Sequence, residues 1–159
     1  MSGKAEKLYN ALSKKYKKMP DFKQLDSEFE LSSMKEDEVN ELYFSRIVRR
    51  RIYEKFYNFN IGLVTIINPQ VPSIILSHEN KFFSNDDRDL IMSIVNKLMK
   101  VEREHLILET EFDESKDADF ITSSFGVWIE VKPSIKKILT VMKDSWGREA
   151  KFKTEDYFG

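Results

Sequence analysis

The chain has 159 residues, of which 33% are charged, and a formal net charge of -1. This length suits one domain with a single hydrophobic core that folds without a metal or a disulfide. Because the chain has no cysteine, disulfides, thiolate nucleophiles and cysteine-bound zinc are excluded, and the balanced charge leaves no basic excess to drive non-specific nucleic-acid binding.

Two N-terminal segments precede the longest predicted helix. Residues Lys4 to Lys18 are predicted to be helical, because apolar residues recur at three- and four-residue steps with lysines on the other side, and Pro20 ends the pattern. Between Asp21 and Ser33 the periodicity weakens. There we expect a loop or a short helical turn that its apolar residues hold against the core.

The stretch from Glu36 to Ile67 carries two stripes at helical spacing and no proline. The apolar stripe consists of Phe44, Val48, Ile52, Phe56, Phe59, Leu63 and Ile66. The second stripe, about half a turn away, is cationic and aromatic and consists of Tyr43, Arg46, Arg50, Tyr53 and Tyr57. The pattern predicts one long central helix with contacts on both sides, ending at Asn68-Pro69.

The next segment, from Pro69 to Phe83, is predicted to be a buried crossover, with or without one short helix. Ser84 then provides a helix start signal, because its hydroxyl and the Asp87 carboxylate three residues later can satisfy free backbone donors. The third helix is predicted to run from there until its apolar stripe fades near Thr110.

The last long segment keeps one apolar phase from Ile121 to Trp146, although Pro133 lies inside it. An interior proline removes a helical hydrogen bond, so we expect a kink near Ile129 or two helices that share one face. A strand over residues 125–131 is the competing prediction, because aromatic and β-branched residues cluster there.

These segments together predict an all-α fold. Residues 1–147 are expected to form a single-domain bundle of about four main helices, with a long central helix and a kinked or broken C-terminal helix. Residues 148–159 are predicted to be a charged C-terminal tail. No apolar run is long enough to cross a membrane, and the N-terminus lacks the apolar core of a secretory signal, so we expect a cytoplasmic protein without membrane contact.

The sequence offers little for catalysis. Glu102 and His105 form a Glu-x-x-His step, which is half of a di-iron carboxylate site, but the second half is missing. His105 also lies in an apolar stripe, where we expect it to pack and to hydrogen-bond Glu102 or Glu109. Because phosphate loops and nucleophile elbows are also missing, we predict no enzyme activity, catalytic residue, metal, cofactor or small-molecule substrate.

The best functional candidate in the sequence is a binding face on the central helix, formed by Tyr43, Arg46, Arg49, Arg50, Tyr53 and Tyr57. Arginine binds phosphate and tyrosine stacks on bases, a combination that single-stranded nucleic acids use. The alternative is structural. If neighbouring helices cover this helix on both sides, the arginines pair with acidic residues and the tyrosines pack.

Two resemblances accompany these patterns. The arginine-rich stretch from Arg46 to Lys55, followed by the Ser84-capped helix up to Arg103, resembles the helical domain of archaeal GINS replication subunits, which implies a nucleic-acid-associated role. The strand-rich domain of that family has no counterpart after Thr110. The tail resembles a sliding-clamp-binding peptide only at Tyr157 and Phe158.

The sequence therefore yields two functional hypotheses. The first is a non-enzymatic interaction or scaffold module that contacts another protein or itself, because 12 phenylalanines and 6 tyrosines exceed what a small helical core readily buries. The alternative is a replication- or repair-type nucleic-acid-associated subunit that uses the Arg/Tyr face.

Overall fold

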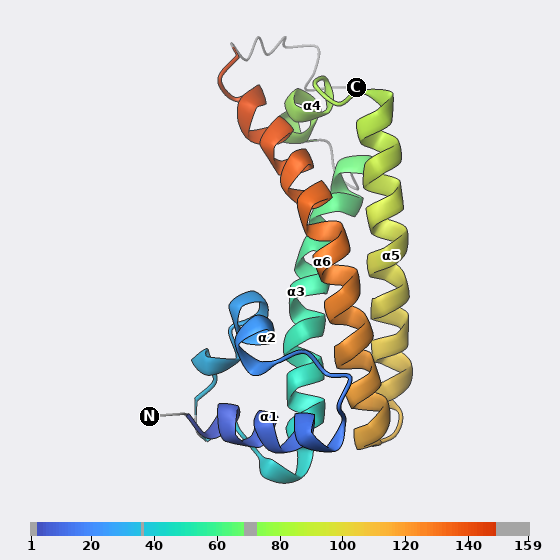
Figure 1. Cartoon of the computed structure of the whole chain (residues 1–159). Coiled ribbons are helices and arrows are strands. Elements are labelled where there is room, and N and C mark those ends of the chain that lie inside the picture. Colours follow the sequence, from blue (N-terminus) through green and yellow to red (C-terminus); the bar gives the residue numbers. More distant parts are fainter. Residues whose placement is uncertain (1–2, 36, 69–72, 149–159) are drawn as a thin grey trace.

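The computed structural model describes residues 3–35, 37–68 and 73–148, and the regular structure in these ranges is entirely helical. Three long helices form the bundle in Figure 1. They are α3 (Phe44–Ile67), α5 (Asn85–Glu109) and α6 (Glu114–Ser145). The shorter elements are α1 (Lys4–Lys15), α2 (Phe22–Phe29), η1 (Leu31–Ser33), η2 (Glu41–Tyr43) and α4 (Ile74–Asn80). The predicted all-α bundle with a long central helix is confirmed.

The central helix begins later than predicted, at Phe44 rather than near Glu36. The reason is a local turn. The side chain of Asn40, which has an extended backbone, accepts a hydrogen bond from the Leu42 N–H and starts η2, which leads directly into α3. Before it, Val39 is buried and its carbonyl oxygen accepts a hydrogen bond of 2.7 Å from Lys4.

The weakly periodic segment after Pro20 contains a true helix, α2. The side chain of Asp21 caps its first turn by accepting a hydrogen bond of 2.9 Å from the Gln24 N–H. The helix ends at Glu30, whose φ of 55° is left-handed. Buried Leu25 and Phe29 fix α2 to the core, so the predicted attachment to the core is correct and the helix is longer than a single turn.

The last segment is one helix, α6, that continues through Pro133. The competing strand prediction for residues 125–131 is therefore wrong. Pro133 cannot donate to the carbonyl of Ile129, but both residues are exposed, so water can solvate that carbonyl. In Figure 1 the C-terminal half of α6 leans away from α5.

The predicted crossover contains one short helix, α4, which packs on the C-terminal end of α6. The buried His78 Nε2 lies 3.0 Å from the carbonyl oxygen of Ser145. Beside it, the Trp146 indole donates a hydrogen bond of 2.8 Å to Glu79. Residues 69–72 of the crossover and residues 149–159 of the predicted tail, including Tyr157 and Phe158, lie outside the described residues.

The buried core follows the stripes of the three long helices and extends under α1 and α2. Its side chains on α3 include all but one member of the predicted apolar stripe, the exception being half-buried Phe59. No helix in the described part of the chain combines the length and hydropathy that crossing a bilayer requires.

The start of α5 is a complete capping box. The Ser84 hydroxyl accepts from the Asp87 N–H at 3.1 Å, and Asp87 accepts from the Ser84 N–H at the same distance. We expect Ser84→Ala to lower the free energy of unfolding by about 1 kcal/mol, as measured by urea denaturation. Ser93→Ala is the matched control at an exposed position inside the same helix, and a comparable loss there would contradict this assignment.

Candidate functional site

The guanidinium of Arg49 is fully buried where α3, α5 and α6 meet. Its Nε lies 2.6 Å from Asp117 Oδ1 on α6, and its Nη2 lies 2.8 Å from Glu109 Oε1 on α5. It also donates to the carbonyl oxygens of His105 and Leu108, at 3.1 and 3.3 Å. These carbonyls belong to the last turns of α5, so Arg49 also caps the C-terminal end of that helix.

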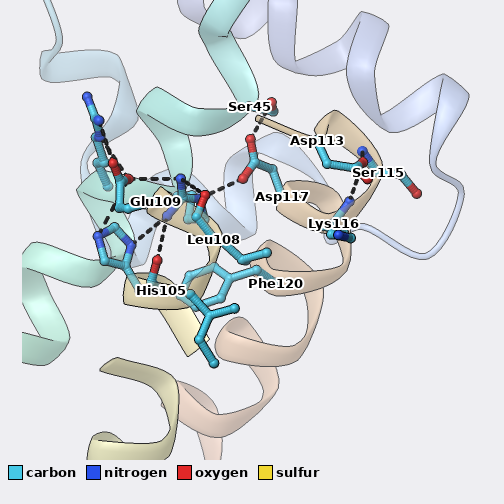
Figure 2. Close-up of polar contacts among 12 residues, drawn as sticks. Ser45, His105, Leu108, Glu109, Asp113, Ser115, Lys116, Asp117 and Phe120 are labelled. Carbon is cyan, nitrogen blue, oxygen red and sulfur yellow. Dashed lines mark hydrogen bonds and ion pairs between the residues drawn. The ribbon is translucent and has the colours of Figure 1, made fainter. Parts of the chain in front are cut away.

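The Asp117 carboxylate has a second partner. Figure 2 shows it turned toward Ser45, whose hydroxyl donates to Asp117 Oδ2 at 2.8 Å. Asp117 is buried, and both of its oxygens are hydrogen-bonded, one to α3 through Arg49 and the other through Ser45. Such full pairing is what makes a buried ion pair tolerable, because each unpaired charge in the interior costs several kcal/mol.

Arg50 reinforces the same corner from the surface. It forms a bidentate pair with Glu109, with N–O distances of 3.0 and 2.6 Å. The hydrogen bond from Arg50, together with the nearby charge of Arg49, lowers the pKa of Glu109 to about 2. Glu109 is therefore ionised at neutral pH and shared by two arginines.

His105 is the aromatic part of this corner. Burial is the main cause that lowers the pKa of His105 to about 4, and the positive charge of Arg49 is the second, so the ring is neutral at pH 7. Its Nδ1 lies 3.0 Å from Arg49 Nη1, and the ring of Tyr53 stacks on it with centroids 3.9 Å apart. The predicted hydrogen bond to Glu109 or Glu102 is not formed. His105 Nε2 lies 3.7 Å from Glu109 Oε1, beyond hydrogen-bond distance, and Glu102 accepts from Asn60 instead.

The remaining members of the predicted Arg/Tyr face also have neighbours. Arg46 is half-buried with its guanidinium 5.3 Å from the ring of Phe112, which Tyr43 meets edge-on at 5.3 Å. Tyr57 lies beside Tyr53, with centroids 5.7 Å apart, and is exposed. The structure thus places Arg49 in the interior and the other five at or near the surface, where Arg46 and Arg50 are engaged within the chain.

No metal constellation emerges at the Glu-x-x-His step. Glu102 and His105 have the separate partners described above, and among the residues that the structure describes no group of three or more His, Asp or Glu side chains is placed to bind an ion.

The structure reveals a second feature, a groove of about 510 Å³ between α2, α3 and the C-terminal half of α6. We call it the α6 groove. Its apolar lining consists of Phe59, Trp128, Ile135 and Leu139, and its polar lining of Ser27, Glu28, Lys55, Lys132, Lys136, Thr140 and Lys143. In Figure 1, α2 lies beside the α3–α6 pair. The groove lining on α2 consists of Ser27 and Glu28, near the C-terminal end of that helix.

One end of the groove is closed by Glu28 of α2. Its carboxylate accepts from the Trp128 indole at 2.8 Å and from Lys132 at 2.6 and 2.8 Å. Burial alone would raise the pKa of Glu28, but these hydrogen bonds prevail and lower it. Lys55 donates to the Glu28 carbonyl oxygen and lies 4.6 Å over the Trp128 ring. This end of the groove is fixed by internal contacts.

The other end is open. Lys136 and Lys143 are exposed, and Leu139 between them is 43% exposed. Within the described residues no carboxylate pairs with Lys136, and Lys143 meets only its neighbour Asp144 at 3.6 Å. The lining therefore carries four lysines and one glutamate, which is already bonded.

The apolar phase predicted from Ile121 to Trp146 includes Trp128, Lys132, Ile135 and Leu139, but the sequence did not identify these residues as a surface. The sequence feature that could have indicated a surface is the set of lysines that follow the same helical steps, Lys132, Lys136 and Lys143. A stripe that packs only against the core is not interspersed with cations. Glu28 gave no signal, because its partners are about a hundred residues away in the chain.

Comparisons of this chain with protein-family models, with curated proteins and with solved structures gave no match.

The Arg49 network leads to a stability prediction. We expect Arg49→Met to lower the free energy of unfolding by about 3–5 kcal/mol, because it leaves Asp117 buried and short of its charged partner. Arg50→Met, the same substitution at the next residue, is the control and should cost about 1 kcal/mol or less, because its side chain is 52% exposed. Urea denaturation measures both, and equal losses would contradict the interior role of Arg49.

The same corner predicts a pH dependence. As pH falls from about 6.5 to about 5, the unfolded chain binds a proton at His105 that the folded chain, with its pKa of about 4, does not, so stability decreases. The lowered pKa of Glu109 acts in the same direction at lower pH: its contribution is complete above about 4.5 and is lost toward about 2.

Urea denaturation at a series of pH values measures this effect, and His105→Gln should flatten the slope between pH about 6.5 and about 5. An NMR titration that gives His105 an ordinary imidazole pKa would disprove the assignment.

Proposed function

We propose that this protein is a non-enzymatic interaction module that binds another protein segment in the α6 groove. The observation that carries the proposal is the exposed apolar side chain of Leu139 beside half-buried Phe59, in a concave surface with a lysine border. Apolar floors with polar borders are typical of the sites where helical domains bind partner segments.

The geometry supports this proposal over the nucleic-acid alternative. A phosphate at Arg50 would have to replace the bidentate Glu109 carboxylate, and Arg49 is out of reach in the interior. In the groove, Trp128 is 3% exposed, so its ring offers no face on which a base could stack.

Site-specific photo-crosslinking tests the proposed function. A photoreactive benzoylphenylalanine replaces Leu139, and the protein is irradiated in an extract of the cells that naturally produce it. The control places the same residue at Leu106 of α5, which is similarly exposed but distant in the chain from every groove residue. We expect a discrete protein adduct from position 139 that is several-fold more abundant than any from position 106.

The adduct is identified by mass spectrometry. A partner protein joined at position 139 supports the proposal, and an adduct between two copies of this chain would identify the module as self-associating. The absence of any adduct at position 139 above the level at position 106 would overturn the proposal.

A further inference from the structure

We propose, on the basis of the function proposed above, that the partner segment is an acidic amphipathic helix. Its apolar side chains would contact Leu139 and Phe59, and its carboxylates would pair with Lys136 and Lys143. Three independent features of the groove lead to this chemistry: its length, its floor and its charge.

The length of the groove fits a helix. Its lining on α6 runs from Trp128 to Lys143, two residues separated by roughly 22 Å at 1.5 Å per residue, or about four helical turns. In Figure 1, α2 lies beside the α3–α6 pair. Its residues Ser27 and Glu28, near the C-terminal end of α2, line the groove. A helix in the groove would therefore extend the layer that α2 begins, and would pack on α3 and α6 as the helices of a bundle do.

The floor of the groove calls for apolar side chains. Ile135 and Trp128 are each 3% exposed and form its base, while Leu139 projects into it with nearly half of its surface accessible. Residues 128, 132, 135, 136, 139 and 143 follow helical steps, so they present one continuous strip. Covering this strip requires a partner with apolar residues at the same steps, and therefore an amphipathic helix.

The charge of the groove calls for acidic side chains. Of its four lysines, Lys132 is bonded to Glu28, and Lys55 lies over Trp128 with its pKa lowered by burial. At the open end, Lys136 has no carboxylate partner within the described residues, and the exposed Lys143 has only the 3.6 Å pair with its chain neighbour Asp144. A helix with carboxylates flanking its apolar face would pair with both, whereas a basic helix would place like charges along the whole border.

Binding of designed peptides tests this inference. The probe is a fluorescent helix of roughly 18 residues with leucines at one face and flanking glutamates, and its affinity for the full chain is measured by anisotropy. One matched peptide has lysine in place of every glutamate, and a second has serine in place of every leucine. We expect the acidic amphipathic peptide to bind at least about tenfold more tightly than either.

Charge reversal in the protein locates the site. Lys136→Glu with Lys143→Glu should weaken binding of the acidic peptide by about tenfold or more, because two attractive pairs become repulsive. The control is Lys18→Glu with Lys100→Glu, which changes the net charge equally at exposed lysines outside the groove and should leave affinity unchanged. Leu139→Ser tests the apolar contact separately, and circular dichroism verifies that all variants are folded.

Four results would overturn the inference. The first two concern the ligand: the lysine peptide binds as tightly as the acidic peptide, or single-stranded DNA competes as effectively as the acidic peptide does. The other two concern this chain itself: it dimerises and Leu139→Ser abolishes the dimer, or the peptide binds only after residues 149–159 are removed. If the peptides show no preference while crosslinks at position 139 persist, the partner chemistry is wrong and the interaction function stands. If crosslinks at position 139 are also absent, both the proposed interaction function and the acidic-helix partner are wrong.

Discussion

The Arg49 guanidinium is the point at which the three long helices are joined. A cation with no exposed surface persists inside a protein only when its charge and donors are matched, and here Asp117, Glu109 and two carbonyls of α5 supply that match. The geometry fixes the register of α3 against both other helices at once. A shift of one residue in any of them would leave an unpaired charge in the interior.

The two ends of the bundle differ in the contacts that hold the helices together. At the Arg49 end, charge pairs bind α3, α5 and α6 together, and α1 adds a pair between Lys15 and Glu114. At the other end α6 leans away from α5, with Pro133 in its C-terminal half, and α4 packs on its last turn through His78 and Ser145. The α6 groove lies along this second part, where α2 has ended and the α3–α6 pair is only partly covered.

The two ends use charge in different ways. Around Arg49, both Arg49 and Arg50 have carboxylate partners. The hydrogen bond from Arg50 lowers the pKa of Glu109, and burial lowers that of His105. Along the groove, lysines outnumber the single glutamate. Lys136, which has no carboxylate partner within the described residues, and Lys143, which pairs only with Asp144, are exposed on either side of Leu139. Matched charge in the interior stabilises a fold, whereas unmatched charge beside accessible apolar surface favours association with a partner of opposite sign.

The sequence by itself determined the all-α class, the start of α5 at Ser84 and the phases of the long helices, because capping and periodicity are local properties of a few neighbouring residues. It also placed Arg49 and Arg50 together, but spacing could not say that one is interior and the other exposed. Only the tertiary structure decided that, through carboxylates about sixty residues away in the chain. The groove is likewise a tertiary property, because Glu28, Phe59 and Leu139 become neighbours only when α2, α3 and α6 pack.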